Sequence, residues 1–363
     1  MYDLGWFTWF AYIHEKFFDP IHFVPMFLPF HRMFAADFER VGQMFHPKFM
    51  LPYWDSARDF SDPAASQVFT SSYAGGNGRG NNCVVDGMQG QWTMGFPTKH
   101  CLQRIFNNGA KIKSWESPER ISNILMTSTT YDSFRNNLEY GLHASIHNGI
   151  AGDMSSKHSP NDIFFFLHHS NMDRIWWKWQ NIQAQNMYAY SGINKDGSAA
   201  KLSDKVTVYN DQLANTMKIG YGNLCYVYDG EVKPAKKRQE ASEMLPEMNL
   251  ASALSSQVLN EYFPLLLNGN IGAKATDLPP NFGQTSMDYI NQHYSSSNSA
   301  ASVQSAASAQ KRIGKPKMPM PGRLSDAWLN MHDVDVNKYD TYYNTSVSFV
   351  NALNSQGYVS PYL

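Results

Sequence analysis

This chain of 363 residues has no long hydrophobic run and almost no net charge. No apolar stretch approaches the roughly 18 residues that a membrane-spanning helix requires, so we expect no membrane span. The 30 Lys and Arg residues nearly balance the 31 Asp and Glu residues, for a formal net charge of −1. This balance gives no reason to expect nucleic acid or an anionic membrane as a partner. The oligomeric state stays open.

Cysteine is scarce, with only Cys83, Cys101 and Cys225 in the chain. Cys83 and Cys101 bracket a loop-like segment and are placed to close a disulfide, which would leave Cys225 free. The alternative is three reduced thiols, and composition alone does not decide between the two. A secretion signal is also not visible, because the N-terminus lacks a basic segment followed by an apolar run and a small-residue cleavage site.

Apolar and aromatic residues are plentiful, at 43% and 14% of the chain, and supply a substantial core. The character of the sequence changes after Asp229, where charged and then low-complexity segments begin. We therefore expect one domain over residues 1–230 and a C-terminal extension over 231–363, with a linker at 295–312. Basic pairs in the extension are either processing sites or solvated charge: Lys236-Lys237-Arg238 and Lys311-Arg312.

Helical patterning dominates the first domain. We expect helices over residues 6–18, from 31 onwards, after the capping residue Ser117, over 131–147, and along the apolar stretch FFFLHHSNMDRIWWKW. Asp19-Pro20 should end the first helix, and an extended piece between Pro25 and Pro29 should precede the second. Residues 61–100 are typical of loop, and GNLCYVYDGEV alternates like a strand. A further helix is expected near the C-terminus.

Histidines gather in two clusters. His143 and His147 are four residues apart, so they project from one face of a helix, and the pair His168-His169 follows in the next helix. An earlier cluster contributes further candidate ligands at His14, His22 and His31. Two helices that aim imidazoles at one another are able to hold a metal in a bundle core. Three plus three imidazoles suit a pair of copper ions, although zinc, iron and nickel also accept imidazole.

Taken together, these segments resemble the tyrosinase and catechol oxidase family, the type-3 copper proteins. The resemblance spans about residues 2–228 and rests on four motifs: FLPFHR (27–32) with Glu39, LPYWD (51–55), LEYGLHASIH (138–147) and SPNDIFFFLHHSNMDRIW (159–176). It implies a mainly α fold, in which a helical bundle core holds a dinuclear copper site, with long loops, few short strands and the C-terminal extension. The spacing of the early histidines is similar to that of the short fungal branch, which also implies a Cys83–Cys101 disulfide.

The resemblance implies a role for each histidine. It assigns His14, His22 and His31 to the first copper ion and His143, His147 and His169 to the second. His168 becomes a packing or supporting residue, and Asp173 becomes a residue that orients a ligand or pairs with Arg174. The remaining histidines are expected on the surface or in hydrogen bonds: His46, His100, His158, His293 and His332. Phe164, Phe165, Phe166, Trp176 and Trp177 are expected in the core, and Tyr226 and Tyr228 as structural residues.

The activity that the resemblance implies is oxidation of o-diphenols to o-quinones with dioxygen, joined in some members by o-hydroxylation of monophenols. Glu139, four residues before His143, is the candidate catalytic residue, either as a base that holds a water or as part of a plain salt bridge. Ala144 replaces the asparagine of many monophenol hydroxylases, which favours diphenol oxidation. Ser156 stands where some diphenol oxidases carry a bulky gate residue, which favours an open entrance, so the two observations conflict.

Two alternatives to a phenol oxidase follow from the same residues: a dioxygen carrier of the haemocyanin type and a metal-poor structural relative. Only thirteen residues precede His14, fewer than the family fold normally supplies, which predicts an incomplete N-terminus. We expect secretion or a cell-wall location if the full gene encodes a signal peptide. If the extension is cleaved, it is expected to cover the copper entrance in the uncut, latent chain.

Overall fold

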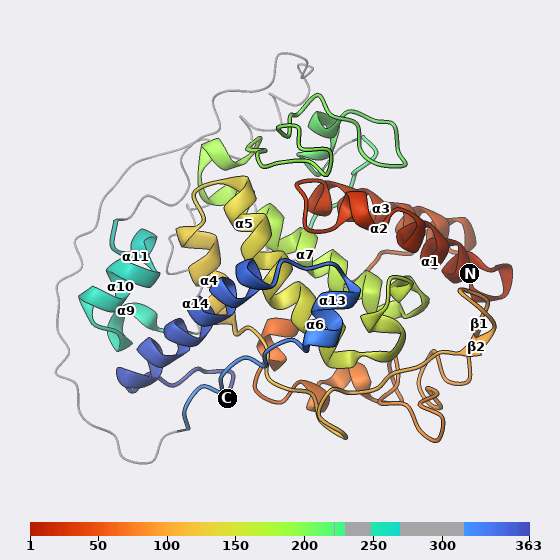
Figure 1. The fold of residues 1–363 in the computed structure, drawn as a ribbon, viewed down its shortest axis with the longest axis horizontal. Coiled ribbons are helices and arrows are strands. Elements are labelled where there is room, and N and C mark those ends of the chain that lie inside the picture. The colour runs from red at the N-terminus through yellow and green to blue at the C-terminus, as the bar shows by residue number, and fades with distance from the viewer. Residues whose placement is uncertain (221, 229–247, 269–315) are drawn as a thin grey trace.

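The computed structural model describes residues 1–220, 222–228, 248–268 and 316–363, and within them the fold is mainly helical, as predicted (Figure 1). The helices and strands are α1 (Trp6–Lys16), α2 (Phe18–Ile21), α3 (Phe27–Phe45), β1 (Thr93–Met94), β2 (His100–Cys101), α4 (Pro118–Thr127), α5 (Tyr131–Leu138), α6 (Ala144–Ile150), α7 (Ile163–Ile182), α9 (Leu250–Ala253), α10 (Ser256–Tyr262), α11 (Pro264–Asn268), α13 (Asp326–Met331) and α14 (Val336–Ser355). Short 3₁₀ turns lie between several of these elements.

Helix α7 runs through the centre of the molecule and is buried along most of its length. Asp162 precedes its first residue, and the Asp162 side chain accepts a hydrogen bond from the Phe164 backbone N–H and so caps the first turn. Phe164, Phe165, Phe166 and Trp176 are all fully buried, as expected, while Trp177 is half-buried. α7 packs against α3, and this pairing brings together the two histidine clusters of the sequence.

The prediction of an extended piece between Pro25 and Pro29 is wrong, because α3 already begins at Phe27. Pro29 is the third residue of the helix, where a backbone N–H has no intrahelical acceptor. A proline in this first turn therefore removes no helical hydrogen bond, and its ring fits the helical backbone. The early start places His31 one turn inside the helix rather than at its entrance.

The expected helix over residues 131–147 is interrupted. Between α5 and α6 the chain forms a π-helical turn, Glu139–His143, with Gly141 in a non-helical conformation. A Cβ built on Gly141 would lie 2.1 Å from the Tyr342 hydroxyl oxygen of α14, so this position leaves no room for a side chain. The π turn shifts the register of His143 relative to α5, in keeping with the frequent occurrence of such turns at functional sites.

Residues 61–100 are mostly loop, as predicted, with short 3₁₀ turns and one strand pair, β1 and β2. β1 and β2 pair antiparallel, with Thr93 opposite Cys101, and a disulfide joins Cys101 to Cys83. Cys225 is free and exposed. The expected strand at GNLCYVYDGEV is not found over residues 222–228, where the side chains of Tyr226 and Tyr228 anchor the segment instead.

The described part of the C-terminal extension packs on the first domain. The Tyr342 hydroxyl donates to Glu116 at 2.6 Å, and the Tyr358 hydroxyl donates to Glu119 at 3.0 Å. A second small apolar cluster joins Tyr140 and Ala144 to residues of α13 and α14, including Trp328. The linker at 295–312, His293 and both basic pairs lie outside the described residues.

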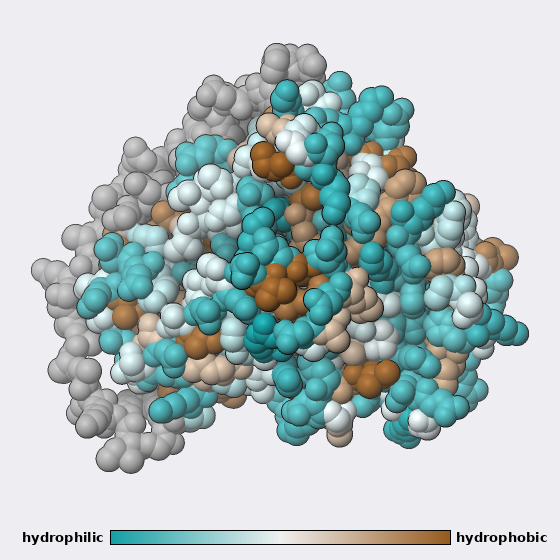
Figure 2. Space-filling model, in the orientation of Figure 1, coloured by the Kyte–Doolittle hydropathy of each residue, from teal (hydrophilic) through white to brown (hydrophobic). Residues whose placement is uncertain are grey.

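The visible surface of the molecule is mostly hydrophilic, with apolar residues in small, separate patches among polar ones (Figure 2). Among the residues that the structure describes, no helix is both long and apolar enough to cross a bilayer, as expected from the sequence. The largest concentration of apolar and aromatic side chains is inside, around α1, α3 and α7.

Candidate metal centre

The three early histidines converge from three different elements. His14 lies in α1, His22 follows α2, and His31 lies in α3, yet their ring nitrogens approach within 4.8 Å of one another. Each Nδ1 donates to a backbone carbonyl: His14 to Lys157 at 2.6 Å, His22 to Phe18 at 3.1 Å, and His31 to Phe27 at 2.7 Å. Because a carbonyl only accepts, the proton belongs on Nδ1, and Nε2 is left with its lone pair free for a metal.

Backbone carbonyls also orient two histidines of the second cluster through Nδ1. His143 Nδ1 faces the Glu139 carbonyl at 3.3 Å, and His147 Nδ1 donates to the Met154 carbonyl at 2.5 Å. His143 closes the π turn and His147 lies in α6, one turn further on, with their rings 4.6 Å apart. Their Nε2 atoms face inward and have no hydrogen-bond partner among the described residues.

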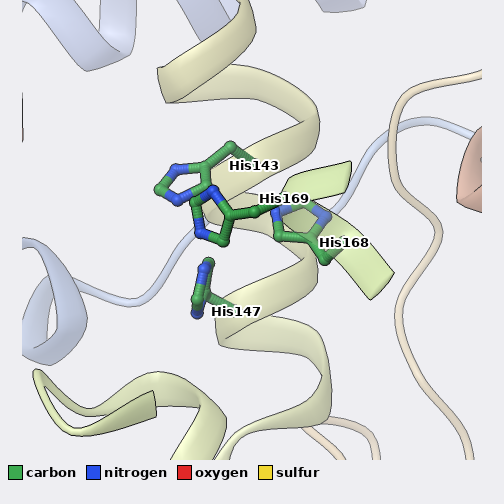
Figure 3. A group of neighbouring side chains, drawn as sticks. All are labelled: His143, His147, His168 and His169. Carbon is green, nitrogen blue, oxygen red and sulfur yellow. The ribbon is translucent and has the colours of Figure 1, made fainter. Parts of the chain in front are cut away.

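His168 and His169 diverge from α7, as neighbours on a helix must. Figure 3 shows His169 between His143 and His147, with His168 to one side. The His169 ring also stacks on His31 at 4.0 Å between centroids, which joins it to the early cluster. The His168 ring lies beside His143 and His147, at 5.4 and 5.3 Å, and is fully buried. The geometry therefore favours His169 as the residue shared by the centre and leaves His168 as a packing neighbour.

The two clusters form one site. His14 Nε2 and His31 Nε2 are 3.3 Å apart, and the His22 and His143 rings lie parallel at 5.9 Å. All seven histidine rings are buried, with at most 5% of each exposed. The predicted ligands from two separate segments of the sequence are thus brought together at short range, around the packed faces of α3 and α7.

Burial keeps these imidazoles neutral. The loss of solvent lowers the pKa of His31 to about 3 and that of His147 to about 4, and it lowers the pKa of His14 and His169 well below the usual value. The neighbouring imidazoles add to the effect for His14 and His169, since two protonated rings would repel one another. A neutral imidazole is the form that binds a metal.

The residues present fit a metal centre. A buried ring nitrogen without a hydrogen bond costs about 1–3 kcal/mol, and a cluster of them is rarely retained without a partner. The unpartnered atoms among the described residues include Nε2 of His143, Nε2 of His147 and both nitrogens of His169. A metal ion at each group would take one nitrogen from each ring, and the donor set of neutral imidazoles suits copper or zinc.

A buried ion pair ties α3 to α7 beside the histidines. Asp173 pairs with Arg32, not with Arg174 as considered from the sequence, and Arg174 lies near Asp55 instead. The Tyr226 and Tyr228 hydroxyls also donate to Asp173, which confirms the structural role expected for both. Arg32 follows His31 and Asp173 lies one turn after His169, so this pair positions the helices that carry both residues. Arg174 is the neighbour of Asp173 in the sequence, but Arg32 is the arginine that is fully buried with Asp173.

Glu139 is buried and uses both carboxylate oxygens. Oε1 accepts from the Phe23 backbone N–H at 2.6 Å, and Oε2 accepts from Arg135 Nη1 at 2.8 Å. Phe23 follows His22, so Glu139 connects the π turn to the loop of the first cluster. Burial raises the pKa of this carboxyl to about 7, even though Arg135 and the Phe23 N–H act in the opposite direction. The salt bridge considered from the sequence is therefore present.

Two phenylalanines pack between the histidines, a role that the sequence analysis did not identify. Phe165 contacts the His169 ring at 4.2 Å and the His14 ring at 4.9 Å. Phe27 contacts His143 at 4.6 Å and His31 at 4.8 Å. Each lies four residues before a histidine of its own helix, and that i, i+4 spacing was the available signal.

His332, expected on the surface or in a hydrogen bond, is buried next to the site. Its Nδ1 donates to the Trp328 carbonyl at 2.9 Å, and its ring stacks on Trp328 at 4.0 Å. The other side faces Phe18 at 5.3 Å, and Phe18 in turn stacks on His22. The C-terminal extension therefore covers the first cluster through a stack of rings. His46 is exposed, and His100 and His158 are half-buried and hydrogen-bonded.

The two positions that bear on substrate choice lie at the margin of the centre. Ala144 is fully buried and packs in the small apolar cluster with α13. Ser156 is half-buried, and its hydroxyl donates to the Asp153 carbonyl at 2.7 Å. A cavity of about 610 Å³ opens between α6 and the C-terminal extension, lined among others by Asn148, Ser155 and Trp328.

Fold and site together define a mainly helical protein with buried groups of histidines that are able to hold a metal. The model of the common central domain of tyrosinase matches residues 5–182. A tyrosinase of Streptomyces antibioticus is 32% identical over 209 residues, which cover 52% of this chain and 74% of that protein. Tyrosinase ustQ of Aspergillus flavus is 28% identical over 247 residues, covering 60% of this chain and 68% of that protein. The chain belongs to the tyrosinase family.

A solved structure shows the same fold. A variant of polyphenol oxidase from Thermothelomyces thermophila matches with a TM-score of 0.50 and 21% identity, over 61% of this chain and 77% of that one. The family is one of type-3 copper oxidoreductases, in agreement with the resemblance on which the sequence interpretation rests.

Proposed function

We propose that this protein oxidises o-diphenols to o-quinones with dioxygen, using two copper ions held by His14, His22, His31, His143, His147 and His169. One observation carries the proposal: two groups of buried imidazoles, with Nε2 lone pairs left free, meet around α3 and α7 in a chain of the tyrosinase family. When bound, the copper pair supplies the redox chemistry that transfers electrons from the phenol to dioxygen.

The protein's own residues orient the histidine ligands and keep bulk water out of the site. The carbonyls of Lys157, Phe18 and Phe27 hold the early imidazoles with Nε2 inward, and that of Met154 does the same for His147. The burial of all these rings excludes bulk water, which strengthens electrostatic interactions inside the site. The relatives named above are tyrosinases or polyphenol oxidases, and this favours an oxidase over the dioxygen carrier.

Glu139 is our proposed proton acceptor, because a phenol must lose its proton to bind a metal. A carboxyl with a pKa of about 7 is well matched to proton exchange near neutral pH. In the Glu139→Gln variant, a base role predicts a lower kcat with copper content retained and an altered pH profile. A loss of copper with the pH profile of the remaining activity unchanged would instead show that Glu139 only positions the Phe23 loop and Arg135.

Diphenols are the proposed substrates, with monophenol hydroxylation as a second activity to be tested. Ala144 places an apolar methyl where an amide would orient a water, which favours diphenols, while the small Ser156 leaves the entrance wide. Copper-loaded protein should be incubated with catechol and, separately, with tyrosine. Quinone from catechol alone supports a catechol oxidase, and quinone from both supports a tyrosinase. No quinone together with reversible dioxygen binding would support a carrier.

The extension is proposed to act as a cover in a latent form of the enzyme. His332 and Trp328 lie over Phe18 beside the first cluster, so phenols cannot approach from that side while the segment is docked. A secreted or cell-wall location is proposed in the same sense, and the Cys83–Cys101 disulfide supports it, since disulfides persist in oxidising compartments.

A further inference from the structure

A third group of potential ligands lies outside the histidine centre described above. His100 begins β2, Asp153 lies in the 3₁₀ turn after α6, and His158 follows in the next loop. One ligand atom from each falls within 4.8 Å of the others. His100 Nε2 is 2.9 Å from Asp153 Oδ1, and His158 Nε2 is 3.8 Å from the same oxygen.

Both imidazoles are held with Nε2 toward the carboxylate. His100 Nδ1 donates to the Thr98 carbonyl at 2.7 Å, and His158 Nδ1 donates to the Glu15 carboxylate at 3.0 Å. A carbonyl or carboxylate on the far nitrogen is the arrangement that orients and strengthens histidine ligands in metalloproteins. Burial opposes protonation of His100, but the Thr98 carbonyl and Asp153 outweigh it and raise the pKa of this imidazole, so that without a metal the ring donates from both nitrogens. A metal ion bound here would replace the Nε2 proton between the ring and Asp153.

The carboxylate is equally well fixed. Asp153 is 3% exposed, and its Oδ2 accepts from the Gln103 backbone N–H at 2.8 Å while Oδ1 accepts from Asn161 at 2.9 Å. Arg and Lys side chains are not among the partners that the structure gives to Asp153, and the neighbouring cation sources in the described residues are the two histidines. The three ligand atoms therefore point into one small space from preorganised positions.

That space opens to solvent. A cavity of about 460 Å³ is bordered by His100, Asp153 and His158 together with Pro97, Gln103 and Ile105. Two imidazoles and one carboxylate with an open fourth position make up a donor set that suits zinc and copper in the divalent state. An ion there needs a water to complete its coordination, and the cavity has room for one.

We propose that His100, Asp153 and His158 form a third metal site that binds one divalent zinc or copper ion with a water as fourth ligand. His158 is connected to the histidine centre through Glu15 and Lys157. Glu15 follows His14, and His158 follows Lys157, whose carbonyl accepts from His14 Nδ1. An ion bound here would stabilise the loop of residues 152–158, which also supplies the Met154 carbonyl that orients His147.

The test is a metal titration of the full chain. Copper-loaded protein is titrated with Zn²⁺ by calorimetry, and in a parallel arm with further Cu²⁺, and bound metal is counted by elemental analysis. Wild type should take up one more ion than His158→Ala, whereas the copper in the histidine centre stays the same in both. The matched control is His46→Ala, which removes an exposed histidine away from the cavity and should behave like wild type.

A second variant separates a built site from a plain hydrogen-bond cluster. Glu15→Gln keeps a hydrogen-bond acceptor for His158 but removes the charge, and it should weaken the extra ion by roughly 10–100-fold. Binding of zinc or copper that is lost in His158→Ala and weakened in Glu15→Gln establishes the site. Failure of wild type to bind an extra ion, or equal uptake by wild type and His158→Ala, overturns the proposal whether or not the histidine centre is active.

Discussion

At the scale of single residues, the recurring feature is a backbone carbonyl on Nδ1 of a histidine. His22, His31 and His143 each use the carbonyl four residues earlier in the chain, while His14 and His147 use carbonyls from a different segment, those of Lys157 and Met154. For His31 this follows from helix geometry, because residues four apart in a helix are neighbours, whereas His22 follows α2 and His143 closes the π turn. The distant cases need the loop of residues 152–158 in place.

The titration of His332 gives a prediction about pH. Burial lowers the pKa of His332 to about 4 from its usual 6.5, and Lys157 adds to the effect while the Trp328 carbonyl opposes it. His14 and His147 also face this ring. Below pH 6.5 His332 becomes protonated in the unfolded or undocked segment but stays neutral in the docked one. The free energy of unfolding therefore decreases as the pH falls.

We expect a loss of about 2 kcal/mol between pH 6.5 and about pH 5 from this residue. Thermal unfolding of wild type and His332→Phe should be followed across this range. Phenylalanine retains the stack on Trp328 but does not titrate, so its stability should fall less steeply with acid. Parallel curves for the two proteins would show that His332 is not the titrating group.

At the scale of helices, the ion pair between Arg32 and Asp173 decides how α3 and α7 sit together. Neither side chain is accessible to water, and Arg32 also donates to the Thr216 carbonyl at 2.9 Å and lies over the Trp176 ring. A buried charge that loses its partner is destabilising, because water cannot replace the lost interaction. The ion pair therefore fixes the helix that carries His31 relative to the helix that carries His169.

Asp173→Asn should lower the free energy of unfolding by about 3–5 kcal/mol and reduce copper content, since Arg32 is left buried without a counter-charge. Urea denaturation measures the first effect and elemental analysis the second. Asp55→Asn is the control, because it removes an acid beside the half-buried Arg174 and should cost no more than about 1 kcal/mol. Similar losses in the two variants would contradict a special role for Asp173.

At the scale of the whole molecule, the C-terminal extension is part of the folded unit. Trp328, Leu329 and Tyr342 pack on Tyr140 and Ala144, directly beside the π turn and α6. The extension therefore rests on the same segment that carries His143 and His147. The proposed covering role predicts that access to the centre depends on how firmly α13 is docked.

Trp328→Ala should loosen α13, raise the rate of catechol oxidation several-fold, and lower the stability of the uncut chain by about 3–5 kcal/mol. Initial rates with catechol and thermal unfolding measure the two effects. Val336→Ala, at a position that is 38% exposed, is the matched control and should change neither. An unchanged or lower oxidation rate in Trp328→Ala, with copper retained, would argue against a covering role.

Much of this architecture was predictable because its signals are local. The pair His168-His169 and the cap at Ser117 depend on neighbours along the chain, and each lies in the expected element. His143 and His147 are close together as expected, although a π turn interrupts the predicted helix at His143. The long-range partners were not predictable in this way. Asp173 and Arg32 are 141 positions apart, and His332 reaches Phe18 from the other end of the sequence.

Irregular backbone conformations also could not be predicted from the spacing of apolar residues. The π turn at Glu139–His143 arises where Gly141 packs against the Tyr342 hydroxyl, a contact between distant segments. The sequence predicts an extended piece up to Pro29, whereas α3 begins at Phe27, because proline is tolerated in a first turn where no helical hydrogen bond is made. In both cases the environment outside the segment determined its conformation.

The central claim is tested most directly by counting copper. Full-length protein, copper-loaded and freed of loosely held metal, should retain at least two ions per chain, and the double variant His31→Ala/His169→Ala should lose two of them. The His168→Ala variant should retain its copper, because its ring lies to one side of the centre. Fewer than two copper ions in wild type, or no loss in the double variant, would contradict a dicopper centre.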